Sequence, residues 1–274
     1  MFAGRDNCFN RKFIAEMSVE HEIVCCLFLE PDRGTTLGRV KKIGKRVTKY
    51  GLIRAFDELA FHVFDRLFLR KREKEFYRNN PDFFIGNTEL SCPVYNIKNI
   101  HDEKCLKMIK EIAPDIIFSI CSHILFEKSL YKIPRLGTFV LHEGITPEYR
   151  GLHTCLWALM KREYQYVGYT VLKVNSQIDS GEILLQGQYN FNAKENYKAW
   201  SWVGHNALIY GLQDIIKSFR ELERDGEFVP IKKENRPNYY YTWMRLSEFL
   251  FLYMKNYFFK EHKFQFFGVL KKIN

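Results

Sequence analysis

Short apolar runs alternate with segments whose apolar residues recur every three or four positions along most of this chain. The runs are rich in β-branched and aromatic residues, as buried strands are, and they lie at 2–4, 22–29, 93–97, 116–121 and 137–142. The segments with helical spacing lie between them, at 9–18, 103–112 and 154–162. Because strands that alternate with helices favour a parallel sheet covered on both faces, we predict an α/β fold with a doubly wound, mostly parallel, Rossmann-like sheet.

The pattern changes in the second half of the chain. Two apolar runs, 167–174 and 182–191, are separated only by the turn-forming segment NSQIDSG, so a hairpin is predicted there. Residues 194–225 then follow a long helical pattern, and Gly226 supplies its stop. We therefore place a main domain over 1–226 and an aromatic-rich C-terminal extension over 227–274.

Two segments differ in composition from this α/β pattern. Residues 33–75 begin with a dense basic stretch and continue into a segment with helical apolar spacing. We favour a basic helical insertion packed on the sheet over a nucleic-acid arm, and binding of phosphate or a membrane surface stays open. The aromatic residues after Pro237 favour packing onto the domain or a partner, over base stacking or an interfacial helix.

Composition and charge narrow the function classes. The 274 residues are 46% apolar and 16% aromatic, enough for a sizeable core, which excludes disorder as the main state. A formal net charge of +10 is typical of proteins that meet an anionic partner, such as a nucleotide, a phosphorylated metabolite, nucleic acid or a lipid surface. A solvated basic surface is the plain alternative.

The cysteines and the apolar run lengths indicate a cytoplasmic location. The seven cysteines lie mostly in apolar contexts without CxxC spacing, so we expect reduced core thiols and no metal site. Neither a secretory leader nor a run of about 18 apolar residues is present, so we do not expect the chain to span a membrane.

Candidate chemistry begins at His142, which ends the apolar run FVLH just before a glycine turn. Doubly wound sheets bind ligands at the carboxyl ends of their strands, so His142 is expected to face a cleft. Asp179 lies in the turn of the predicted hairpin, where a carboxylate can orient an imidazole and stabilise its protonated form. Each residue alone has an ordinary structural explanation, and the pair is what indicates catalysis.

The segments HEGITPEYRG (142–151) and IDSGEILLQ (178–186) together resemble the folate-dependent formyltransferase superfamily, and the element order over roughly 1–215 does so too. This group includes glycinamide ribonucleotide, methionyl-tRNA and sugar-amine N-formyltransferases. The resemblance implies that the main domain is catalytic, that 10-formyltetrahydrofolate is the formyl donor, and that His142 and Asp179 are the catalytic residues.

The resemblance also implies which residues meet each substrate. The donor's pterin ring is expected between Ser122, His123, Ile124 and Leu125 on one side and Val174 and Asn175 on the other. The acceptor is expected beside Gly4, Arg5 and Asn7, with Tyr149, Arg150 and His153 contributing from the turn behind the site.

One position departs from the family pattern. The family carries an asparagine two residues before the catalytic histidine, and its amide stabilises the oxyanion, whereas Val140 stands there in this chain. Loss of one such donor costs on the order of 100-fold to 1000-fold in rate. Protonated His142 together with a backbone amide is the compensation we favour over His123 or His153.

The activity we expect is formyl transfer to a primary amine of an anionic small molecule, with a nucleotide-linked amino sugar for surface polysaccharide as the best candidate. Three alternatives stay open: an impaired, formyltransferase-fold binding protein, a formyltetrahydrofolate hydrolase and a methionyl-tRNA formyltransferase-like enzyme. No specific nucleic-acid partner is expected. Peripheral membrane contact, through the basic insertion or the aromatic tail, and a homodimer also stay open.

Overall fold

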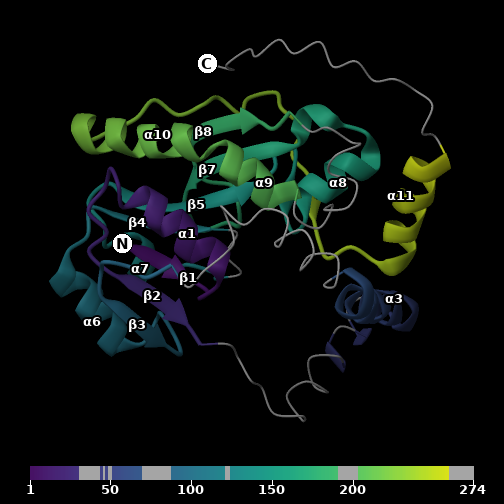
Figure 1. The fold of residues 1–274 in the computed structure, drawn as a ribbon, viewed down its shortest axis with the longest axis horizontal. Helices are drawn as coiled ribbons and strands as arrows, with labels where there is room; N and C mark the ends of the chain where they lie inside the picture. Colours follow the sequence, from purple (N-terminus) through teal and green to yellow (C-terminus); the bar gives the residue numbers. More distant parts are fainter. Residues whose placement is uncertain are drawn as a thin grey trace.

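A seven-stranded sheet forms the centre of the computed structural model, which describes residues 1–30, 44, 45, 47, 48, 51–69, 88–120, 124–190 and 203–258 (Figure 1). Its strands run in the order β3-β2-β1-β4-β5-β7-β8. The strands are β1 (Phe2–Gly4), β2 (Cys26–Leu29), β3 (Val94–Ile97), β4 (Ile116–Ile120), β5 (Gly137–Glu143), β7 (Gly168–Lys173) and β8 (Ile183–Gln188).

The sheet is parallel from β3 to β5 and antiparallel beyond it, which confirms the predicted doubly wound, mostly parallel fold. β7 and β8 form the predicted hairpin. The strand order reverses between β1 and β4, and ligands bind at such a reversal, outside the carboxyl ends of the strands. β5 lies beside β4, so His142 is near this edge of the sheet.

Helices cover both faces of the sheet. One face carries α1, α9 and α10, whose apolar residues share a core with Phe118 and Phe139, and the other carries α6 and α7. The helices are α1 (Cys8–Met17), α6 (Glu103–Ile112), α7 (Lys128–Tyr131), α8 (Thr154–Lys161), η2 (Tyr164–Tyr166), α9 (Val203–Tyr210) and α10 (Leu212–Asp225).

We predicted one long helix over 194–225, but the described part of this segment forms two helices, α9 and α10. α9 and α10 are separated at Gly211, where the ring of Tyr169 occupies the space that a side chain would need. Glycine also has a low helix propensity, so the chain changes direction there. α10 ends as predicted, at Gly226, whose φ of +79° favours glycine. Residues 194–202 lie outside the described residues.

The C-terminal extension packs directly on the main domain. Strand β9 (Tyr240–Tyr241) pairs with β6 (Arg150–Gly151), the two residues of the turn that follows β5, and Ile231 bridges to Ile183 of β8. Helix α11 (Leu246–Phe258) then adds Phe249 to an apolar cluster shared with α8. The boundary at residue 226 remains a prediction.

The basic insertion contains α3 (Leu52–Phe64) and a π-helical turn, η1 (Asp65–Leu69). We expected its helix to pack on the sheet, but α3 packs on α11 instead, with the ring of Phe61 5.5 Å from that of Phe249 (Figure 1). The predicted basic stretch itself lies largely outside the described residues.

The cysteines of the described chain are free, as expected for reduced thiols. Four of them are buried, and burial raises the pKa of the Cys25 thiol to about 11. No helix among the described residues is long and apolar enough to cross a bilayer.

Candidate active site

His142 lies near the carboxyl end of β5 and is only 4% exposed. Its Nε2 is 3.0 Å from the carbonyl oxygen of Tyr149. A carbonyl oxygen only accepts hydrogen bonds, so Nε2 carries the hydrogen, and Nδ1 is the unprotonated nitrogen of the neutral ring. Nδ1 lies 3.8 Å from Oδ2 of Asp179. The nitrogen that can take a proton is therefore next to the carboxylate of Asp179.

Three successive residues of the turn after β5 hold this pair together. The carbonyl of Tyr149 accepts from His142, the guanidinium of Arg150 donates from Nε to the carbonyl of Ile178 at 3.1 Å, and the backbone N–H of Gly151 donates to Oδ2 of Asp179 at 3.1 Å. Gly151 and Asp179 are 28 residues apart in sequence. The two motifs that indicated catalysis thus form one hydrogen-bonded unit.

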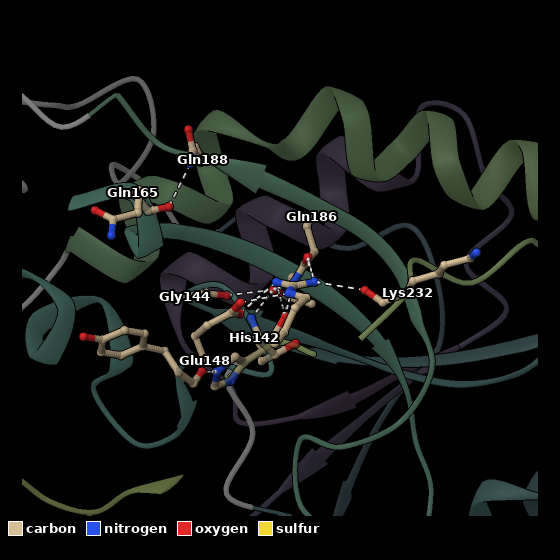
Figure 2. Close-up of polar contacts among 11 residues, drawn as sticks. His142, Gly144, Glu148, Gln165, Gln186, Gln188 and Lys232 are labelled. Carbon is tan, nitrogen blue, oxygen red and sulfur yellow. Dashed lines mark hydrogen bonds and ion pairs between the residues drawn. The ribbon is translucent and has the colours of Figure 1, made fainter. Parts of the chain in front are cut away.

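A polar network on the other side of the turn includes a residue of the C-terminal extension. Arg236 donates from Nε and Nη2 to the two carboxylate oxygens of Glu148, both at 2.8 Å, and from Nη2 to the carbonyl of Thr146 at 2.8 Å. It also donates to Oε1 of Gln186, on β8, at 3.1 Å. Figure 2 shows Glu148 and Gln186, two members of this network, beside His142. The network ties the turn to both the hairpin and the extension.

Sequence reasoning missed Arg236 and Glu148. Glu148 lies within the motif HEGITPEYRG, and that position could have indicated its importance. Its side chain is 7% exposed. A buried carboxylate requires a partner. Arg236 is one of 42 lysines and arginines, and only the folded chain places it against Glu148.

Tyr149 anchors the turn after β5 in the core. It is fully buried, its hydroxyl donates to Glu163 at 2.8 Å, and its ring stacks on that of Tyr241 with 4.8 Å between centroids. Burial, together with the Glu163 carboxylate, raises the pKa of Tyr149, so the hydroxyl stays a donor. The structure places this residue in the core, whereas we expected it to face a substrate. Arg150, also expected there, holds the Asp179 turn and the side chain of Asn238.

The family described as formyl transferase matches residues 65–201, half of the chain, including both His142 and Asp179. The chain belongs to the formyl transferase family. Its members take the formyl group from formyl-tetrahydrofolate.

Individual relatives of the formyl transferase family share only part of this chain. The bifunctional polymyxin resistance protein ArnA of Wigglesworthia glossinidia brevipalpis is 35% identical over 107 residues, 39% of this chain and 16% of that protein. A methionyl-tRNA formyltransferase of Kosmotoga olearia is 29% identical over 109 residues, 40% of this chain and 35% of that protein. The chain spans about half or less of the length of the curated relatives it matches.

A solved 4-N formyltransferase from Francisella tularensis has a similar fold. The alignment covers 88% of this chain and 75% of that one, with a TM-score of 0.50 and 14% sequence identity. The mixed α/β architecture described above is thus the architecture of formyl transferases.

The residues expected to contact the donor lie in different surroundings, and their role stays a prediction. Ile124 and Val174 are half-buried and pack against one apolar cluster. Leu125 is 62% exposed. The Oδ1 atom of Asn175 already accepts from its own turn. Ser122 and His123 lie outside the described residues.

Val140 belongs to the same apolar cluster as Ile124 and Val174. Side chains two residues apart on a strand point to one face, so Val140 and His142 share a face of the sheet. Its register partner on β4 is Ser119, a fully buried residue whose hydroxyl has no hydrogen-bond partner in the described structure. The position where the family carries an asparagine is therefore beside an unsatisfied hydroxyl.

The loop expected to meet the acceptor follows β1. Asn7 caps α1, because its Oδ1 accepts from the backbone N–H of Asn10 at 2.8 Å. A side chain at Gly4 would collide with the ring of Phe2. Of the three residues expected here, Arg5 is the one whose side chain is both exposed and charged.

His153 precedes α8 and contacts two other parts of the fold. Its ring is 4.7 Å from that of Trp243, in the extension. Its backbone N–H and the next one donate to the carboxylate of Glu143, whose pKa is raised by burial. Burial also lowers the pKa of His205 to about 4, and the nearby charge of His153 adds to this effect. His205 is therefore neutral at neutral pH.

Proposed function

We propose that this protein transfers a formyl group from 10-formyltetrahydrofolate to a primary amine of a small anionic molecule, a nucleotide-linked amino sugar. The observation that supports this most is the His142–Asp179 pair, with Nδ1 of the imidazole directed at the carboxylate and both residues held by one turn. Such a pair has the arrangement of a general base beside a carboxylate.

In this proposal 10-formyltetrahydrofolate supplies the formyl carbon that the amine attacks. Nδ1 of His142 accepts the proton that the amine loses and returns it to the departing nitrogen of the folate. Asp179 stabilises the imidazolium between these two transfers, and the Nε2–H bond to Tyr149 keeps the ring from rotating. The products are an N-formyl amine and tetrahydrofolate.

The oxyanion that develops on the formyl oxygen requires donors, and Val140 has none to offer. In our proposal the protonated ring of His142 and a backbone amide take this role. An impaired, purely binding function is the alternative that Val140 favours, since one lost donor costs on the order of 100-fold to 1000-fold.

The acceptor is proposed from charge. The net charge of +10 and the exposed Arg5 beside the end of β1 suit a substrate with phosphate groups. We propose a small anionic molecule, and methionyl-tRNA is the alternative that the test below distinguishes.

The test is tetrahydrofolate release from 10-formyltetrahydrofolate, with and without a panel of nucleotide-linked amino sugars. We expect release that depends on the acceptor. His142→Ala and Asp179→Asn should lower turnover by at least about 100-fold while folate binding, measured by calorimetry, persists. Asp115→Asn is the control, because Asp115 is exposed and pairs with Arg135 at the opposite ends of the strands.

Each other outcome contradicts the proposal in a distinct way. Release without an acceptor would mean a hydrolase, and transfer to methionyl-tRNA alone would mean a different acceptor class. Tight folate binding without release would mean a binding protein. Full turnover in His142→Ala would remove the catalytic assignment itself.

A further inference from the structure

Helix α3 and the turn η1 carry an apolar stripe that faces away from the protein. Its members follow one another at intervals of three or four residues, which places them on one helix face, and they are Leu52, Phe56, Leu59, Val63 and Leu67. Each is between 42% and 64% exposed. We call these five residues the outer stripe.

The face of α3 that meets the protein is more polar than the outer stripe. Asp57 accepts from the backbone N–H of Ser247 at 3.0 Å, and Arg54 donates to Thr242 at 3.0 Å. Glu58 is 4% exposed and faces inward with Phe61. An amphipathic helix on a soluble domain normally buries its apolar side. α3 buries Ala55 and Phe61 on its inner face but leaves the longer outer stripe exposed, so the stripe is available to another partner.

The outer stripe meets the first residue of α11. A groove of about 400 Å³ lies along α3 and η1 and reaches Leu246, and its lining residues are all apolar: Phe56, Leu59, Ala60, Val63, Phe64, Leu67, Phe68 and Leu246. Leu250 and Met254 follow Leu246 at intervals of four residues and are 40% and 50% exposed. Contiguous apolar surface of this extent marks a binding face.

Basic runs flank this face in the sequence. Residues 39–49 carry six lysines and arginines without an acidic residue, and 70–74 carry four with one glutamate. We propose that the α3–α11 face docks on an anionic lipid surface, with the outer stripe entering the headgroup region and the positive charge that the sequence carries before and after α3 supplying the electrostatic attraction. An apolar helix face combined with a polybasic segment supplies the two attractions that stable peripheral binding needs.

Charge decides between this partner and the others. Two copies of this chain carry the same net charge of +10, so like-charge repulsion opposes their association. Nucleic acid would neutralise the basic runs but would leave the outer stripe in water. An anionic bilayer satisfies both features at once. The proposal concerns a surface that does not include His142, and it does not depend on the acceptor.

The test is co-sedimentation of the full chain with vesicles. One set is phosphatidylcholine alone, and the other contains about one third phosphatidylserine. We expect binding to the anionic set, which weakens when salt is raised from about 0.1 M to about 1 M, because the screening length falls from about 10 Å to about 3 Å.

Two pairs of variants separate the contributions. Phe56→Ser with Leu67→Ser should lower the partition coefficient roughly 10- to 100-fold, whereas Val19→Ser with Val229→Ser should leave it unchanged although both valines are more than 75% exposed. Lys41→Glu with Lys42→Glu should lower it at least about 30-fold. Lys107→Glu with Lys217→Glu makes the same change in net charge on exposed helices elsewhere and should have a much smaller effect.

Unfolding curves and formyl-transfer rates should be the same for all four variants and the natural chain. Equal binding to neutral and anionic vesicles would overturn the proposal, as would stripe variants that bind like the natural chain. Absence of vesicle binding, with a dimer in sedimentation velocity that Phe56→Ser and Leu67→Ser dissociate, would assign the face to a second copy instead.

Discussion

A methyl group at Gly151 should separate the C-terminal extension from the turn that follows β5. Gly151 has a φ of +102°, and a Cβ there would lie 2.1 Å from the carbonyl oxygen of Tyr241. That oxygen accepts the backbone N–H of Leu152 at 3.0 Å, and Arg150 makes a matching bond to Tyr239 at 3.1 Å. Gly151→Ala therefore cannot fit unless β9 moves away and both bonds lengthen.

The expected cost follows from these contacts. A residue with a Cβ in this backbone region costs about 1–2 kcal/mol, and each of the two hydrogen bonds contributes about 1 kcal/mol net. Gly151→Ala should therefore lower the free energy of unfolding by about 3–4 kcal/mol. Gly226→Ala is the matched control, because its φ is +79° and a methyl group there would extend into open space. It should cost only about 1 kcal/mol.

Urea unfolding of the two variants measures this difference, and turnover gives a second readout. Gly151 also donates its N–H to Asp179, so Gly151→Ala should lose turnover under conditions where it is still folded. Gly226→Ala should retain turnover. If the two variants lie within about 1 kcal/mol of each other, β9 does not clamp the turn and the reasoning is refuted.

Three further predictions concern the buried polar groups. Arg236→Ala leaves the Glu148 carboxylate buried without its partner and should lower the free energy of unfolding in urea by about 3 kcal/mol. Adding Glu148→Gln should recover part of that loss, and additive effects of the two substitutions would contradict a coupled pair. Val140→Asn should raise turnover by at least about 10-fold, because Ser119 is positioned to hold the new amide; a decrease would mean that the oxyanion is stabilised elsewhere. The pKa of His205 is lowered to about 4 in the folded chain, so the folded ring stays neutral at about pH 5, whereas the unfolded chain takes up a proton below pH 6.5. The stability that is present above pH 6.5 is therefore lost progressively as the pH falls. The free energy of unfolding should drop by about 1–2 kcal/mol from pH 7 to pH 5, and His205→Gln should flatten that slope; an unchanged slope would exclude His205 as its source.

The C-terminal extension packs on the chain between β5 and α8 through Arg236, Tyr241 and Trp243. These residues contact Glu148, Tyr149 and His153 respectively, all within the turn that carries the motif. The aromatic character of the extension, noted in the sequence, thus reflects packing beneath and beside that turn. Base stacking is not needed to explain these aromatic side chains.

The sequence by itself determined the sheet, the order of its elements and the two catalytic candidates. Apolar runs of strand length mark buried strands because both faces of a parallel sheet are covered, and the periodicity is local information. His142 and Asp179 were found because each lies in a short motif whose residues are neighbours along the chain. The glycine that ends the helical pattern, Gly226, was also recognisable from the local sequence. The need for glycine at Gly211 was not, because the ring that fills the space beside it belongs to Tyr169, 42 residues earlier.

Only the tertiary structure decided what each polar or apolar face meets. Periodicity showed that α3 has an apolar side but not that this side faces outward, since its inward contacts with Thr242 and Ser247 come from nearly 190 residues away. Arg236 likewise acquires a role only when the chain returns to Glu148, 88 residues earlier. Burial and pairing depend on contacts that close long loops, and a local pattern does not specify which of many basic or apolar residues will make them.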